Sequence, residues 1–165
     1  MNQEELFFIG VIVNNHFGVL TRVSSLFSRR GYNIESLVVG VTDHPEISRM
    51  TIAMRGDTQI KAQVLKQLRK LIDVVEAGEI PAEQAVIREH MLIKIRMSDN
   101  NAALSDIIGR FGGEVVDFCV GAITVEVTGA AEKNDEFVES VRPFGILEIC
   151  RAGAQALHRG PEKLV

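Results

Sequence analysis

One pattern limits the fold of this chain more than any other: the first half of its 165 residues is repeated in the second. Each half has the order strand, helix, strand, strand, helix, strand, and each first helix leads through glycine into a strand that ends at Gly40 or Gly121. The aligned helix residues are offset by 84 positions: Leu20, Val23 and Phe27 match Leu104, Ile107 and Phe111. A βαββαβ unit is the ferredoxin-like plait, so we predict an α+β protein of two such plaits in tandem.

The predicted elements divide the chain into two domains. In the first half we expect strands over residues 6–13, 34–41, 47–54 and 73–77 and helices over 19–30 and 60–71. In the second half we expect strands over 86–97, 114–121, 122–127 and 147–150 and helices over 102–111 and 132–141. The predicted domains are residues 1–79 and 87–165, with residues 80–86 as the linker.

The first predicted strand, Leu6–Val13, is apolar on both faces. A two-layer plait buries one face of its sheet, so its strands should alternate between apolar and polar residues. The second face of this strand therefore needs cover from a second domain or a second chain. We predict a homodimer on this ground.

Composition and charge argue against several classes of protein. The formal net charge of -4 gives no support for a nucleic-acid partner. Cys119 and Cys150 fall within predicted strands, where we expect them to be buried as small hydrophobic residues rather than paired in a disulfide framework. The N-terminus lacks the basic region of a signal peptide, and no apolar run is long enough to span a membrane. These features favour a cytoplasmic protein that binds no membrane.

No catalytic or metal-binding motif is present in the sequence. The four histidines are scattered, with none at metal-ligand spacing, and there is no nucleophile elbow, Walker loop or dinucleotide fingerprint. The glycine-rich stretch 109–113 follows a predicted helix, which is typical of a helix stop and turn rather than of a phosphate site. We therefore expect no catalytic residues, no metal and no cofactor in this chain.

The segment 14–20, between the first strand and the first helix, has the residues of a ligand site. A helix N-terminus offers unpaired N–H groups and partial positive charge, and Gly18 permits close approach of a carboxylate. Asn15 can both donate and accept hydrogen bonds, which suits a zwitterion. The alternative is that Asn and Gly are ordinary turn and cap residues here, and the same holds for Asn33 after Gly31. Arg22 on the first helix is expected to lie on a solvated face.

Long, ordered motifs in both halves resemble the small subunits of acetolactate synthase. The first half carries G-Y-N-I-E-S-L at residues 31–37, then T-x-x-P-x-I-S-R-M-T-I at 42–52, with N-x-x-G-V-L-x-R-V upstream at 15–23. The second half carries R-E-x-x-L-x-K-I at 88–95, P-F-G-I-x-E-x-x-R-x-G at 143–153 and A-L-x-R-G at 156–160. The resemblance covers nearly the whole chain.

This resemblance implies a fold, a function and a set of partners. It implies an N-terminal ACT domain and a C-terminal ferredoxin-like domain, in a subunit that activates the catalytic subunit of acetolactate synthase and confers feedback inhibition by valine. Thiamine diphosphate, Mg and FAD would belong to that catalytic partner. Valine would bind across a homodimer of ACT domains, contacted in one chain and in the other by matching residues: Asn15, Gly18, Val19 and Leu20, with Asn33 and Ile34.

Two departures from the family pattern and two alternative functions bear on this interpretation. His16-Phe17 replaces a smaller or more polar pair, so we expect Phe17 to narrow or cap the pocket, and the connection 98–103 is short. The first alternative is an ACT-repeat amino-acid sensor that regulates a different biosynthetic enzyme, against which the match over residues 143–160 argues. The second is a stand-alone enzyme on a plait scaffold, since fold alone does not fix function.

Overall fold

The computed structural model describes residues 5–97 and 102–164, which form two compact units. One unit contains residues 1–87 and 154–165, and the other contains residues 88–153. The short connection 98–103 lies mostly outside the described residues. The chain therefore crosses between the units twice, once within its fifth strand and once within its eighth.

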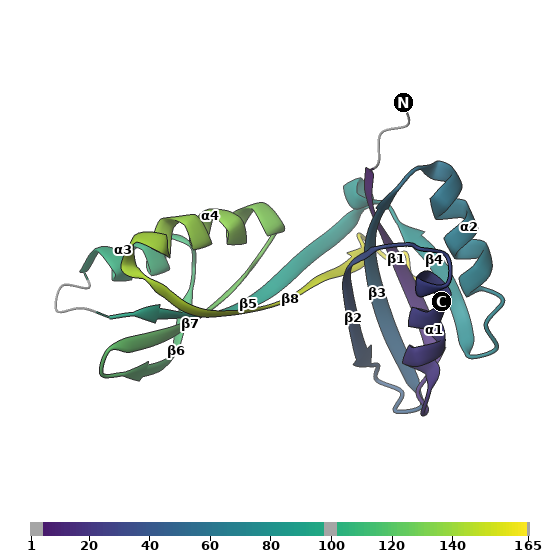
Figure 1. Cartoon of the computed structure of the whole chain (residues 1–165), viewed down its shortest axis with the longest axis horizontal. Helices are drawn as coiled ribbons and strands as arrows, with labels where there is room; N and C mark the ends of the chain where they lie inside the picture. Colours follow the sequence, from purple (N-terminus) through teal and green to yellow (C-terminus); the bar gives the residue numbers. More distant parts are fainter. Residues whose placement is uncertain (1–4, 98–101, 165) are drawn as a thin grey trace. The chain divides into compact units, whose positions relative to one another are not determined.

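Each unit is a four-stranded antiparallel sheet with two helices (Figure 1). The first half folds as β1 (Glu5–Asn14), α1 (Val19–Ser28), β2 (Ile34–Val41), β3 (Ile47–Gly56), α2 (Thr58–Leu68) and β4 (Val74–Ile80). A short 3-10 helix, Ala82–Gln84, follows. The second half folds as β5 (Ala85–Arg96), α3 (Ala102–Arg110), β6 (Glu114–Cys119), β7 (Ala122–Gly129), α4 (Ala131–Val141) and β8 (Ile146–His158), with a 3-10 turn at Arg142–Phe144.

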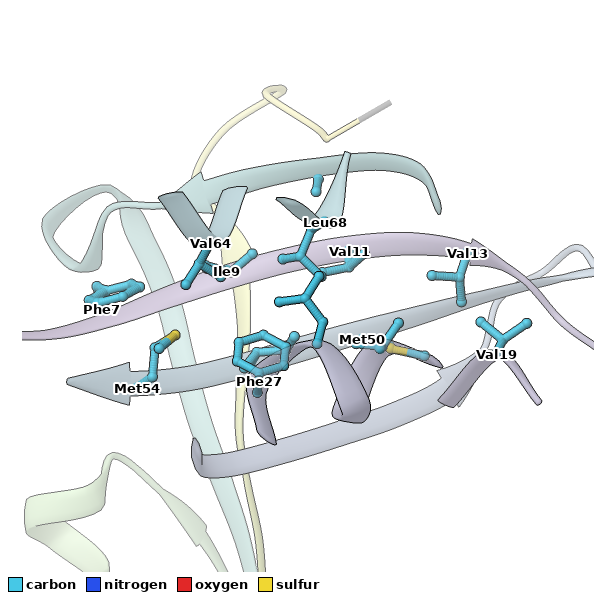
Figure 2. Packing of buried hydrophobic residues seen from close by; sticks show 14 residues of the cluster. Phe7, Ile9, Val11, Val13, Val19, Phe27, Met50, Met54, Val64 and Leu68 are labelled. Atoms are coloured by element: carbon cyan, nitrogen blue, oxygen red, sulfur yellow. The ribbon is translucent and has the colours of Figure 1, made fainter. Parts of the chain in front are cut away.

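The strand orders confirm the predicted pair of plaits. The first sheet is ordered β2-β3-β1-β4 and the second β6-β7-β5-β8, so each strand has its counterpart in the other sheet. The two helices of each unit pack on the same face of its sheet. In the first unit Phe27 of α1 and Leu68 of α2 point at strand residues such as Ile9 (Figure 2).

Most predicted element bounds agree with the structure to within two or three residues. The second helix begins at Thr58, earlier than predicted, because the Asp57 carboxylate caps it by accepting a hydrogen bond from the Ile60 N–H at 2.8 Å. The last strand is far longer than predicted. The sequence did not indicate its second half because R-A-G-A-Q-A-L-H lacks the β-branched residues that mark a strand.

The second face of β1 is covered by the C-terminal residues of the same chain. Phe8 and Ala53 on this face pack against Ala154 and Ala156, and the side chain of Leu164 lies over two glycines. Those glycines, Gly10 on β1 and Gly78 on β4, are direct partners in the sheet. The apolar second face of β1 was predicted to need a second domain or a second chain. Because the chain's own last residues supply the cover, this strand gives no argument for a dimer.

Polar contacts hold the same C-terminal segment. Arg49 Nη2 donates to the Ala156 carbonyl at 3.0 Å, and the Ala154 N–H donates to Ser36 Oγ at 3.0 Å. Burial lowers the pKa of the Arg49 guanidinium. Residues 154–164 thus belong to the first unit, whereas residues 87–165 were predicted to form the second domain. The predicted linker, residues 80–86, contains the end of β4, the 3-10 helix and the start of β5.

The predicted burial of the two cysteines was wrong. Cys119 at the end of β6 and Cys150 in β8 are both exposed free thiols. Both lie on edge strands of the second sheet, where a predicted strand position does not imply burial.

Candidate functional site

Three hydrogen bonds, two from backbone N–H groups and one from a side chain, hold the loop between β1 and α1 where it leaves the sheet. The Asn14 N–H donates to the Asp73 carbonyl at 2.9 Å, and the Asn15 N–H donates to the Glu46 carbonyl at 2.7 Å. Asn15 Nδ2 donates to the Pro45 carbonyl at 2.8 Å. The side-chain amide of Asn15 therefore uses one of its N–H donors to bind the β2–β3 turn, and its Oδ1 is still available as an acceptor.

Gly18 forms the N-cap of α1 with a left-handed backbone, φ 87° and ψ -9°. This conformation is costly for any residue with a Cβ, so the glycine is required by the turn. No side chain caps the helix. In the described part of the chain no acceptor is found for the N–H groups of Gly18 and Leu20, while the Val19 N–H makes only a long bond of 3.4 Å to the His16 carbonyl. The start of α1 thus presents unpaired N–H groups, which is the geometry that favours an anion.

The residues of this helix start have different roles. Val19 is buried in the core of the first unit, so only its backbone can take part in a site. The Leu20 side chain is 47% exposed, and Phe17 is fully exposed. The prediction that Phe17 narrows or caps the pocket therefore finds no support within one chain, because its ring packs on nothing there.

The second predicted segment follows the left-handed Gly31, whose φ is 67°. Asn33 is exposed, and Ile34 begins β2 and packs partly on the core. Tyr32 holds this turn to α2, because its hydroxyl donates to Gln63 Oε1 at 2.9 Å.

Within one chain the two predicted segments lie at opposite ends of the sheet. Asn14, at the start of the loop, pairs with Ile47 at the beginning of β3, whereas Ile34 pairs with Met54 near its end. These partners are seven residue steps apart along β3, a distance of about 23 Å. A small molecule cannot contact both segments of the same chain.

A buried ion-pair cluster beside the loop was missed by the sequence analysis. Asp73, which is 5% exposed, has Oδ1 3.0 Å from His16 Nε2 and Oδ2 3.0 Å from Arg22 Nε. Arg22 lies on a solvated face, as predicted, and its side chain is 50% exposed, but the sequence did not indicate that its guanidinium pairs with the buried carboxylate. The one available signal was an acidic residue, Asp73, between the apolar pairs Leu71-Ile72 and Val74-Val75.

The second unit carries a different charged cluster. Arg151 of β8 pairs with Glu89 of β5, and its Nη1 donates to Asp135 of α4 at 2.6 Å. Burial by itself would lower the pKa of Arg151, but the hydrogen bonds that its guanidinium donates to Asp135 and Glu89 outweigh this effect and raise that pKa. This cluster ties β8 to β5 and α4.

Over 5–97 and 102–164, no three His, Cys, Asp or Glu side chains gather as a metal site. No helix in these ranges combines the length and apolar character of a membrane span.

Two family models together match most of the chain. Residues 9–76 match the AHAS small subunit-like ACT domain, which places the first plait in the ACT class. Residues 88–160 match the small subunit of acetolactate synthase.

Similar proteins extend this match over nearly the whole chain. The chain is 44% identical to a probable acetolactate synthase small subunit of Methanothermobacter thermautotrophicus, covering 92% of each chain. It is 41% identical to the acetolactate synthase isozyme 3 small subunit of Escherichia coli, covering 92% of this chain and 94% of that one. The crystal structure of the acetolactate synthase small subunit from Thermotoga maritima superposes with a TM-score of 0.90 at 32% identity, over 96% of this chain and 99% of that one. The chain belongs to the family of acetolactate synthase small subunits.

Proposed function

We propose that this chain activates the catalytic subunit of acetolactate synthase and makes it sensitive to feedback inhibition by valine. Membership of the small-subunit family supports the regulatory role. The single observation that carries the valine part is the open N-terminus of α1 behind Gly18. The chain itself is not an enzyme in this proposal, and thiamine diphosphate, Mg and FAD belong to the catalytic subunit. Both subunits work in the cytoplasm.

The valine site is formed by two copies of the chain. Asn15, Gly18, Val19 and Leu20 come from one copy, and Asn33 and Ile34 come from the other. The separation of about 23 Å between these groups within one chain supports this division. A single chain offers half a site at each end of its sheet, so a homodimer becomes a condition for binding.

The topology of the first sheet favours a dimer through β2. This strand is an edge, so one row of its N–H and C=O groups is open to a second strand. Val41 at its far end pairs with Ser48, which also pairs with Val13 beside the loop. If two β2 strands pair antiparallel about a two-fold axis, Ile34 of the second copy comes to the end that carries the loop of the first.

Exposed apolar residues lie along this edge. Val39 is 41% and Val41 60% exposed, and both face the helix-covered side of the sheet, since they pair with Met50 and Ser48 on that face. Leu20 at the start of α1 is also exposed. A two-fold partner would bury these three side chains.

Each group of the site then has a distinct role toward valine. The N–H groups of Gly18 and Leu20 bind the carboxylate, and the carbonyl oxygens of the Asn15 and Asn33 side chains accept from the ammonium group. Ile34 contacts the isopropyl group. Such an apolar contact separates side chains by about 1–3 kcal/mol per methylene, so leucine and isoleucine bind more weakly than valine rather than not at all.

The proposal is tested by reconstitution with a purified catalytic subunit. Acetolactate formation from pyruvate should rise when the chain is added, and valine should reverse the rise. The coupling is reciprocal, so the catalytic subunit must change the affinity of the chain for valine by the factor by which valine changes its own binding. Turnover of pyruvate by this chain alone, or activation of a different biosynthetic enzyme instead, would contradict the proposal.

Calorimetry on the chain tests the site itself. Asn33→Ala should weaken valine binding about tenfold or more, because a hydrogen bond to a charged group is lost. Gln59→Ala, an exposed change on α2, is the control and should leave the affinity unchanged. If Asn33→Ala binds valine as tightly as the unchanged chain, the assignment of the site is wrong.

A further inference from the structure

Asp73 is a buried carboxylate immediately before β4 that contacts the end of β1, the loop between β1 and α1, and α1 at one residue each. Its backbone carbonyl accepts from the Asn14 N–H, its Oδ1 lies 3.0 Å from His16 Nε2, and its Oδ2 lies 3.0 Å from Arg22 Nε. The Asp73 side chain is 7% exposed, while those of His16 and Arg22 are 50% exposed. The Asp73 carboxylate is buried, and the half-exposed side chains of His16 and Arg22 are positioned by their contacts with it.

A carboxylate with so little access to water depends on these partners. Removing a charge from water is costly unless an opposite charge or a hydrogen bond replaces the solvent. The Arg22 contact brings the charges together without an aligned N–H···O bond, and Asp73 Oδ2 has no hydrogen-bond donor among residues 5–97 and 102–164. Coulombic attraction therefore ties Asp73 to Arg22.

The guanidinium that Asp73 holds lies against the carboxylate end of the proposed site. Arg22 is one helical turn after Gly18, and its N–H donates to the Gly18 carbonyl at 3.0 Å. A Cβ placed on Gly18 would lie 3.6 Å from Arg22 Nη2. A full positive charge thus stands beside N–H groups that already favour anions.

The charges around Arg22 affect which carboxylates the proposed site selects. A helix N-terminus with an uncompensated arginine attracts any carboxylate, including one whose molecule has no ammonium group. Because Asp73 lies 3.0 Å from Arg22, the pair as a whole is neutral. The part of the site that binds the carboxylate therefore attracts anions less strongly. A ligand must then contribute its ammonium interactions to bind well.

We propose that Asp73 is a specificity-determining residue: by neutralising and positioning Arg22 over Gly18, it makes the site select a zwitterionic amino acid over a simple carboxylate. The inference rests on the proposed function, in that the start of α1 binds the carboxylate of the effector. Asp73 acts through Arg22 and does not touch the ligand.

The test compares valine with isovalerate, which has the same carbon chain and carboxylate but no ammonium group. Dissociation constants for both are measured by calorimetry on the full-length chain, and their ratio is the preference for valine. Asp73→Asn should reduce this preference about fivefold, the size of one partly solvated charge interaction. The double variant Asp73→Asn with Arg22→Gln has a neutral pair again and should restore it.

Arg22→Gln alone gives an independent test with the opposite sign. It leaves the Asp73 charge uncompensated near the carboxylate end, so both ligands weaken and isovalerate weakens more, which widens the preference. This variant keeps the inference open to refutation if Asp73→Asn does not fold. Asp117→Asn and Arg29→Gln, at exposed positions, are the matched controls and should leave the preference unchanged.

The outcomes separate the inference from the function on which it rests. If the unchanged chain binds no valine, the proposed function fails and the inference fails with it. If it binds valine, but Asp73→Asn weakens valine and isovalerate by the same factor, Asp73 has only a structural role and the inference alone is overturned. A preference unchanged in Arg22→Gln overturns it equally.

Discussion

The two sheets of this chain share one topology but differ on the face that their helices leave open. In the repeat, which has an offset of 84 residues, Phe8 corresponds to Leu92 and Gly10 corresponds to Lys94. Across the strand pairs, Ala53 beside Phe8 corresponds to Glu126 beside Leu92. In the first unit this face is apolar and covered by the C-terminal residues.

In the second unit the same face is charged and partly accessible. Lys94 lies 3.4 Å from Glu148, and His90 lies 3.4 Å from Glu126, all on strands of one sheet. The helix-covered cores of the two units remain similar, with Ile9 matched by Ile93 and Val11 by Ile95. Changes at every second strand residue are therefore enough to give one fold two different surroundings, because alternate residues point to opposite faces.

The largest expected effect comes from a matched pair of truncations on this face. Phe8→Ala should destabilise the first unit by about 3–5 kcal/mol, since it leaves a cavity under the C-terminal segment. Leu92→Ala, at the corresponding half-buried position, should cost about 1 kcal/mol. Urea unfolding followed by circular dichroism measures both, and equal costs would contradict the difference between the two faces.

A second substitution tests the cover itself. An alanine Cβ at Gly10 would overlap Leu164 Cδ1 and come within 2.9 Å of Ile80 Cδ1, so Gly10→Ala should cost about 1–3 kcal/mol. Adding Leu164→Ala should recover part of that loss in the same unfolding measurement. Gly40→Ala, where a Cβ would meet no atom within 4 Å, is the control. If the double variant is no more stable than Gly10→Ala, Leu164 does not occupy this position.

The smallest expected effect concerns the edge strands. Val39 on β2 and Phe118 on β6 are counterparts, because they pair with Met50 and Ile123, and both are exposed. With a dimer through β2, Val39→Lys should weaken self-association about tenfold, or about 1.4 kcal/mol, while Phe118→Lys leaves it unchanged. Analytical ultracentrifugation over a concentration series distinguishes these, and the reverse order of effects would place the dimer on β6.

The fold was predictable because its signals are local. Apolar spacing in α1 and α3 and the turn chemistry at Gly31 act over a few residues, and they survive in any tertiary setting. The strand order followed from the repeat, which two sheets with matching orders confirm.

The rest depended on contacts between distant parts of the sequence. The residues that cover β1 are alanines and Leu164, in a segment without a strand pattern. Hydrophobic periodicity alone therefore could not predict that this segment packs on β1. The pairing of Asp73 with Arg22 joins residues that are 51 positions apart, and nothing in the helix pattern of α1 distinguishes Arg22 from Arg29. The predicted site residues Asn15 and Gly18 were marked by turn chemistry, and their division between two chains stays a prediction.

The return of the C-terminal residues to the first sheet also sets an order of events during synthesis. Phe8 and Ala53 leave the ribosome early, but Ala154, Ala156 and Leu164 are made only after residues 88–153 of the second unit. Until those residues are made, the first unit has one completed core and one bare apolar face, a state prone to association with other chains. A chain that lacks these residues keeps that face uncovered, so we expect it to associate with other chains through its first strand.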